Sequence, residues 1–241
     1  MKKIYISLLL LLCSVGAVHA QRVGDITQGT LNELTMFDNR VKQLYGTYYF
    51  QKEWSKGKLV IIHEGKVKTF NDYPIRYDLG NQHIEMKVRN GLVPNDKQQI
   101  IKIIDDKYLK VFQFINSKTK KVNYFERCAD YKTEKPLPGF FEVLHKGKKA
   151  SLLKYTTTYV QKGNEMKTLG IGSRDERIQR KVRYYLSKGS TTFKIKRRKK
   201  AILKALTDKQ TEVKAYAKKN KLYFAKVDDL VKIIAHYNSL Q

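Results

Sequence analysis

Cysteine is nearly absent from this chain of 241 residues, and its scarcity excludes a disulfide framework. The two cysteines are Cys13 and Cys128. Cys13 lies in a hydrophobic leader that export would remove, and the single remaining thiol cannot form an internal bridge. Because Cys128 ends a strand-like run, we expect it to be a buried, unreactive thiol. Leu12 occupies the position where a lipoprotein signal needs a small residue, so no lipid anchor is expected.

Long apolar runs are also missing from the sequence after the leader. The longest is Leu59–Ile62, far below the ~20 residues of a membrane-spanning helix. The sequence therefore predicts no transmembrane helix. The leader itself has a basic start, an apolar run at Leu8–Leu12, and small residues that suit cleavage before Gln21. We expect residues 1–20 to be a signal peptide and the protein to be exported to the periplasm, to the outer-membrane periphery or to the medium.

Acidic residues are few, with 22 Asp and Glu against 49 Lys and Arg. The excess is uneven, because residues 136–241 hold 26 basic and 8 acidic groups. Such a field attracts polyanions, although a basic surface that only confers solubility is the alternative. For an exported protein the expected partner is an anionic envelope component (lipopolysaccharide, a phospholipid headgroup or an acidic glycan) or an envelope protein complex. Nucleic acid is not expected, and a sequence-independent nucleic-acid binder is the weakest alternative.

Motifs for catalysis are missing as well. The sequence contains no Gly-x-Ser-x-Gly elbow and no Walker loop. No two histidines after the leader have the spacing of metal ligands, and no cysteine pair exists. We therefore assign no catalytic residue, no metal and no cofactor. The leading hypothesis is a non-catalytic binding module of the cell envelope, and the alternative is a secreted hydrolase that acts on an acidic polymer.

Alternation of apolar and polar residues dominates the middle of the chain. In Tyr73–Leu79 and in Ile84–Val88 every second residue is apolar, and the turn signal Gly80-Asn81 separates the two runs. This period of two predicts half-buried strands. Short, regular spacing without long intervening helices favours antiparallel pairing. The predicted fold class is mainly β: an antiparallel meander or partly closed barrel followed by a C-terminal bundle of short α-helices, α+β overall.

Domain boundaries follow from these patterns. Residues 21–45 form a polar segment with a short helix that begins near Leu31. Residues 46–196 form the antiparallel β domain, with a glycine-containing loop at 161–179. Residues 197–241 form a basic helical tail, in which Leu230, Ile233, Ile234 and Tyr237 share one helical face.

Two basic stretches are the candidate anion-binding residues. One is Arg174, Arg177, Arg180, Lys181 and Arg183, and the other is Lys194, Lys196, Arg197, Arg198, Lys199 and Lys200. The second stretch spans the predicted end of a strand and the first turn of a helix, where cations oppose the helix dipole. Conflicts of this kind often mark functional sites. A solvated charged face without a ligand is the alternative.

Three segments together resemble a family of small basic exported proteins of Gram-negative envelopes that has no known function. They are Lys56–Val60 through Tyr73–Tyr77, Gly139–Leu144, and the helical ending from Asn220–Leu222 to Tyr237–Leu240. The resemblance covers most of the chain after the leader. It implies export but no activity, substrate or site residue.

Overall fold

The computed structural model describes residues 43–89, 99–166 and 171–240. The predicted signal peptide and the predicted helix near Leu31 lie outside the described residues. Within them, no helix has the length and apolar character needed to cross a membrane.

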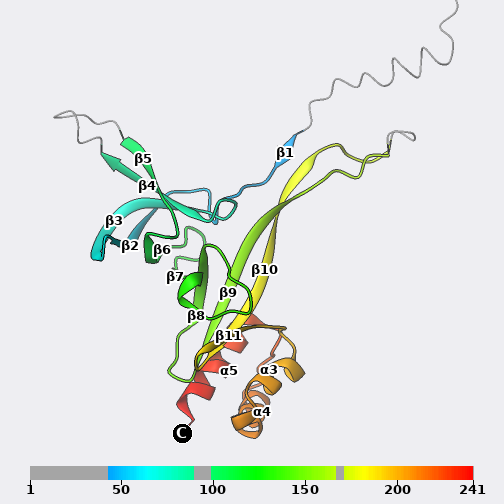
Figure 1. Cartoon of the computed structure of the whole chain (residues 1–241). Coiled ribbons are helices and arrows are strands. Elements are labelled where there is room, and N and C mark those ends of the chain that lie inside the picture. The colour runs from blue at the N-terminus through cyan, green and yellow to red at the C-terminus, as the bar shows by residue number, and fades with distance from the viewer. Residues whose placement is uncertain (1–42, 90–98, 167–170, 241) are drawn as a thin grey trace, which may run out of the picture. The chain divides into compact units, whose positions relative to one another are not determined.

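Eleven strands form one sheet in this part of the chain (Figure 1). They are β1 (Leu44–Tyr45), β2 (Ser55–His63), β3 (Lys66–Asp78), β4 (His83–Arg89), β5 (Gln99–Ile104), β6 (Leu109–Ile115), β7 (Val122–Arg127), β8 (Phe140–His145), β9 (Ala150–Gln161), β10 (Glu176–Lys188) and β11 (Thr191–Ile195). A short 3₁₀ segment, η1 (Cys128–Asp130), follows β7. The predicted alternation is visible at the end of β3, where Ile75 and Tyr77 are buried and Arg76 between them is not.

The strand order departs from a simple meander. It reads β1-β10-β9-β8-β7-β6-β2-β3-β4-β5, with β11 also paired to β10. Two runs of sequential antiparallel neighbours therefore meet where β6 pairs with β2, and β1 pairs with β10 in parallel. The mainly β class with C-terminal helices is confirmed. The sheet follows a meander only within each of its two sequential runs, because it is mixed at β1–β10 and crosses over at β2–β6.

A short connection forces the sheet to curl around β2–β6. Ile104 ends β5 and Leu109 begins β6, yet the two strands are four places apart in the sheet. In a flat sheet four spacings would separate them by about 19 Å. The connection covers at most about 17 Å when extended, and it also turns, since Tyr108 N donates to Asp105 O at 3.2 Å. Curling removes the conflict, but the strand pairs found in the described residues do not close the sheet into a barrel.

Aromatic rings fill the inside of this curl. Phe112 stacks on Phe125 with ring centroids 4.5 Å apart, and the edge of Phe140 approaches Phe112 at 4.9 Å. Tyr77 lies 5.2 Å from Phe112 and donates a hydrogen bond to Gln82 Oε1 at 2.6 Å. Burying rings on this scale stabilises the fold mainly through the apolar area removed from water.

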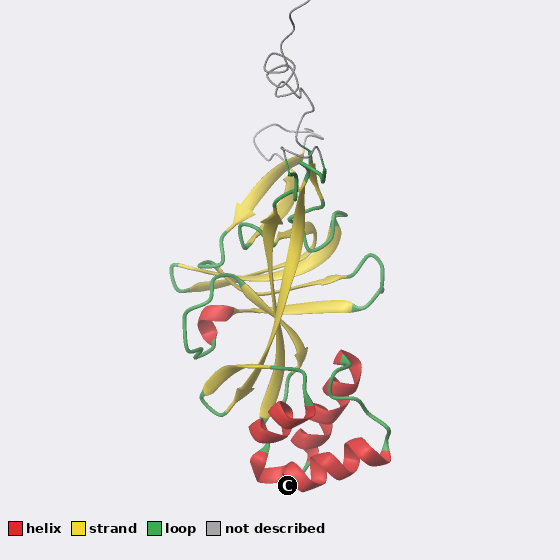
Figure 2. Cartoon of the chain, turned by 90° about the vertical axis from the view of Figure 1, so that its right-hand side faces the viewer, coloured by secondary structure: helices red, strands yellow, loops and turns green. Residues whose placement is uncertain are grey.

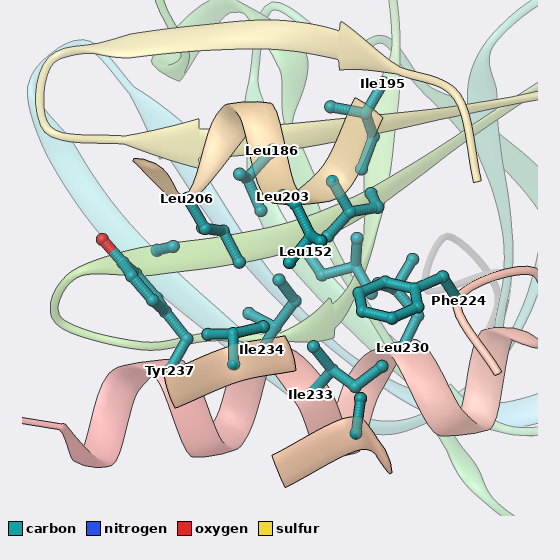
Figure 3. Close-up of a cluster of buried hydrophobic side chains, with 14 residues drawn as sticks. Leu152, Leu186, Ile195, Leu203, Leu206, Phe224, Leu230, Ile233, Ile234 and Tyr237 are labelled. Carbon is teal, nitrogen blue, oxygen red and sulfur yellow. The ribbon is translucent and has the colours of Figure 1, made fainter. Parts of the chain in front are cut away.

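A second core joins the helices to the sheet. The helices are α3 (Lys199–Ala205), α4 (Gln210–Lys219) and α5 (Val227–Ser239), with the 3₁₀ turn η3 (Thr207–Lys209) between the first two. Figure 2 shows them gathered at one end of the strands. The predicted apolar face of α5 is confirmed, because its four apolar residues pack against Leu152 of β9 and Leu186 of β10 (Figure 3). Helices this short depend on such packing for their stability.

Two further sequence predictions can be compared with the structure. Cys128 is buried, with 1% of its surface exposed, as predicted. The predicted loop at 161–179 is too long, because β10 begins at Glu176 and pairs with β9 along its whole length. Arg177 and Arg180 consequently lie in a strand.

Candidate anion-binding grooves

The second basic stretch is carried by the hairpin of β10 and β11 and by α3, which follows it directly. Gly189 adopts a φ of +59°, a conformation that glycine reaches without steric cost, and so forms the tight turn between the strands. The pair Tyr184↔Ile195 closes the ladder. Lys194 therefore lies on the last strand, and Lys196 lies between it and α3.

A groove of 1120 Å³ runs beside this hairpin. We call it the lysine groove, and its lining residues are Lys148, Lys149, Lys188, Gly189, Ser190, Thr191, Phe193, Lys194, Ile195, Lys196, Ala201, Lys204, Ala205, Asp208 and Tyr237. Six lysines thus face a single acid. Phe193 is 36% exposed and, with Ile195 and two alanines, gives the lining an apolar part.

Four of these lysines have their charge available to a ligand. Lys148, Lys194, Lys196 and Lys204 are exposed, and within the described residues their ammonium groups have no ion pair and no hydrogen bond. Lys149 differs, because its Nζ donates to the Leu240 carbonyl. The unpaired lysines come from the start of β9, from β11 and its end, and from α3, so only the fold brings them together.

The acid of the groove is already engaged. Asp208 accepts a hydrogen bond from Lys188 Nζ at 2.5 Å and another from Tyr237 OH at 2.8 Å. The hydrogen bond from Lys188 lowers the pKa of the Asp208 carboxyl below its ordinary value. Burial alone would lower the pKa of Lys188, but its contacts with Asp208 and Tyr237 raise it. Asp208 is the one carboxylate among the residues that line the groove. The groove thus lacks the second carboxylate that hydrolysis by a pair of carboxylates requires.

A second basic groove, of 570 Å³, is lined from the start of α3, α4 and the segment before α5. We call it the arginine groove, and its lining residues are Arg197, Arg198, Lys199, Lys214, Ala217, Lys218, Lys221, Leu222, Tyr223, Phe224 and Ala225. Six cations and no acid line it. Arg197 is fixed in place, because it donates to Ala225 O at 2.5 Å and its guanidinium lies 4.6 Å from the Tyr184 ring centroid.

The predicted basic residues are distributed over several places. Lys194 and Lys196 line the lysine groove, whereas Arg197, Arg198 and Lys199 line the arginine groove. Lys200 is exposed and lines neither.

The first basic stretch lies along β10 and is not one site. Arg174 forms an ion pair with the Glu165 carboxylate. Arg180 donates to Tyr49 O at 2.7 Å and to Phe50 O at 3.0 Å and so holds that backbone in place. Arg177 lines a small pocket beside β1. Lys181 is exposed, and the Arg183 guanidinium lies 5.9 Å from the Tyr155 ring centroid. Arg177 and Lys188 are separated by about 36 Å of extended strand, so this stretch does not join the grooves as one surface.

Sequence reasoning missed two kinds of residue. Lys148 and Lys204 belong to the lysine groove. Lys148 is distant in sequence from the basic run, Lys204 follows it by one helical turn, and no local signal assigns either to the groove. The second miss is a cluster of Asp78, His83 and Glu85 on β3 and β4. A signal for it existed, because the predicted turn at Gly80-Asn81 places Asp78 and His83 opposite each other.

Comparisons with known proteins add no assignment. No protein-family model matches the chain, and searches of curated proteins and of solved structures find no match to it.

Proposed function

We propose that the protein is a non-catalytic, exported binding module of the cell envelope that engages an anionic amphiphile, such as a phospholipid or lipopolysaccharide, through the lysine groove. The observation that carries the proposal is the set of four unpaired ammonium groups at one groove with a single, already neutralised acid. Clustered ammonium groups attract phosphate oxygens strongly when no competing carboxylate is near.

The apolar part of the lining favours an amphiphile over a purely polar anion. Phe193 and Ile195 lie among the lysines, so a ligand with a phosphate group and a hydrocarbon part could satisfy both. The arginine groove, on the other side of α3, adds six more cations near the same helix. These cations extend the positive potential that attracts an anionic ligand, because the potentials of neighbouring charges add.

The direct test removes the four unpaired charges. A variant with Lys148, Lys194, Lys196 and Lys204 replaced by Gln keeps the Lys188–Asp208 pair intact, so we expect it to fold normally. Each lysine near an anionic surface contributes about 1 kcal/mol, so the loss of four should lower the affinity for phosphatidylglycerol vesicles on the order of 1,000-fold. Binding is measured by co-sedimentation, with phosphatidylcholine vesicles as the uncharged reference.

A matched control separates a site from net charge. Lys66, Lys68, Lys102 and Lys110 are exposed on β3, β5 and β6, and their replacement by Gln changes the net charge by the same amount. We expect this control to bind vesicles nearly as the native protein does. If both variants lost the same vesicle affinity, net charge alone would explain the binding and the proposal would be refuted. Retention on heparin without vesicle binding would indicate an acidic glycan instead of an amphiphile.

A further inference from the structure

The β3–β4 hairpin places three metal-ligating side chains on one face of the sheet. Asp78 ends β3 and is paired with His83, the first residue of β4. Glu85 lies two residues further along β4 and therefore points to the same side as His83. Glu85 is in turn paired with Arg76, which lies two residues before Asp78. The register of one hairpin is thus sufficient to bring an imidazole and two carboxylates together.

The distances within this trio are close to those of a coordination shell. His83 Nε2 lies 3.8 Å from Asp78 Oδ2 and 3.9 Å from Glu85 Oε1. Ligand atoms of the three residues all lie within 4.8 Å of one another. With bonds of about 2.1 Å, neighbouring ligands of a tetrahedral zinc ion are about 3.4 Å apart. The two distances from His83 exceed this value by about 0.4 and 0.5 Å, and the distance between the carboxylates exceeds it by at most about 1.4 Å. Side-chain rotations that bring the two carboxylates together would make the fit.

The unsatisfied Nε2 atom of His83 is the strongest evidence for a bound ion at this trio. This atom is buried, yet none of the described residues forms a hydrogen bond with it. Buried polar atoms are nearly always satisfied, and an exception requires a physical reason such as an ion. Asp78 and Glu85 are 6% and 9% exposed, so the trio is shielded from bulk water.

Hydrogen bonds from neighbouring groups orient the two carboxylates, as is usual for the ligands of a metal. Asp78 Oδ1 accepts from the backbone N–H of Gly80 at 2.7 Å and of Asn81 at 3.1 Å. Glu85 Oε1 accepts from Tyr49 OH at 2.8 Å. Each carboxylate oxygen has two lone pairs, so Asp78 and Glu85 can keep these hydrogen bonds and still coordinate an ion.

We propose that Asp78, His83 and Glu85 bind one divalent first-row transition-metal ion, with zinc the best match. An imidazole nitrogen with two carboxylates suits such an ion better than calcium or magnesium, which prefer oxygen ligands alone. The bound ion links β3 to β4 beside their turn. The protein supplies three ligands and leaves the fourth coordination position open.

Positive charges near the trio define the rival explanation. The Arg76 guanidinium contacts Glu85 Oε2 at 2.7 Å, and it lies 3.6 Å from the Tyr49 ring centroid and 4.5 Å from that of Trp54. Lys87 lies 4.5 Å from the Trp54 ring centroid on the same side. Arg76 pairs with Glu85, whereas Asp78 has no Lys or Arg partner among the described residues. The rival explanation is that His83 contacts the two carboxylates without any metal, and the experiment separates the two.

The experiment uses the untagged, metal-stripped full chain with Zn²⁺ and Co²⁺ as probes. We expect one Zn²⁺ per chain by isothermal titration calorimetry, a rise in Tm with Zn²⁺ but not with Mg²⁺ or Ca²⁺, and visible absorption bands from bound Co²⁺. His83→Gln should weaken Zn²⁺ binding on the order of tenfold or more and abolish the Co²⁺ bands. Asp78→Asn should do the same, because Asn retains the acceptor for Gly80 but loses the charged ligand.

His63→Gln is the matched control, because His63 is exposed on β2 and stands outside the trio. It should leave the stoichiometry and the Co²⁺ spectrum unchanged. Circular dichroism without metal should show the native sheet in every variant. If the native protein takes up no Zn²⁺, or if His83→Gln binds Zn²⁺ as well as the native chain, the proposal is wrong. Lysine-groove variants should bind Zn²⁺ normally, which keeps this test independent of the proposed function.

Discussion

Besides its apolar packing, α5 is tied to the start of β9 by the hydrogen bonds of one side chain, Asn238. Its Oδ1 accepts hydrogen bonds from the backbone N–H groups of Lys149 and Ala150, both at 2.9 Å. Its Nδ2 donates to Ala150 O at 2.8 Å. Replacing Asn238 by Ala removes all three tertiary hydrogen bonds at a partly buried position. With a net value of about 1 kcal/mol each, we expect the free energy of unfolding to fall by ~2–3 kcal/mol.

A second substitution should act through the same contact. A Cβ added at Gly147 would collide with the amide group of Asn238, so Gly147→Ala should displace it and cost ~2 kcal/mol through the same hydrogen bonds. When residue 238 is already Ala, the colliding atoms are gone. The double variant should therefore be more stable than the sum of the single effects predicts, by ~1–2 kcal/mol.

Urea denaturation followed by circular dichroism measures these differences. Ser239→Ala is the control, because Ser239 Oγ only donates locally to His236 O at 2.7 Å on an exposed surface, and it should change the stability by less than about 0.5 kcal/mol. A comparably small effect of Asn238→Ala, or strictly additive effects of Asn238→Ala and Gly147→Ala, would refute the arrangement of α5 against β9.

Three further predictions concern buried groups. Phe112 is 1% exposed and has four aromatic neighbours, so Phe112→Ala should lower the free energy of unfolding by about 3–5 kcal/mol; a loss below about 1 kcal/mol would contradict the aromatic core. Burial raises the pKa of the Cys128 thiol, so a thiol reagent at mildly alkaline pH should modify Cys128 only after denaturation, and rapid labelling of the native protein would contradict its burial. Burial lowers the pKa of His145 below 6.5, so its neutral form is favoured in the folded state, and the associated stability is complete above that value and declines as the pH falls through it. His145→Leu should therefore lose less stability than the native protein between about pH 7 and about pH 5 in urea titrations.

Local patterns predicted much of the sheet but not its pairing. The alternation in Tyr73–Leu79 and Ile84–Val88 identified the paired parts of β3 and β4, because each of these strands has one buried and one wetter face. β3 extends well before the alternating run at Tyr73 and continues through Asp72 at a φ of +60°. The pairing of β2 with β6 could not be predicted, since no period within one strand states which partner it will meet.

The missed start of β10, from Glu176 to Gln179, has a similar physical cause. None of these residues is buried, so neither face of the ribbon packs on a core there. Alternation arises only where one face is buried, and its absence made the segment resemble a loop. The basic run Lys194–Lys200 was visible in the sequence, but its division between two grooves depends on where β11 ends and α3 begins.

The three helices provide an internal comparison for the placement of charge. Glu212 lies in the first turn of α4, and Asp228 and Asp229 lie in that of α5, so both helices satisfy the electrostatic preference of a helix N-terminus. The first turn of α3 has no acid, begins with Lys199 and Lys200, and receives no side-chain cap from Arg198. Overall basicity cannot explain this difference, because the same chain places acids correctly twice within the next thirty residues. The unfavourable charges are confined to α3, whose Lys199 lines the arginine groove and whose Lys204 lines the lysine groove. Under the proposed function, an anion held at either groove would lie beside this helix.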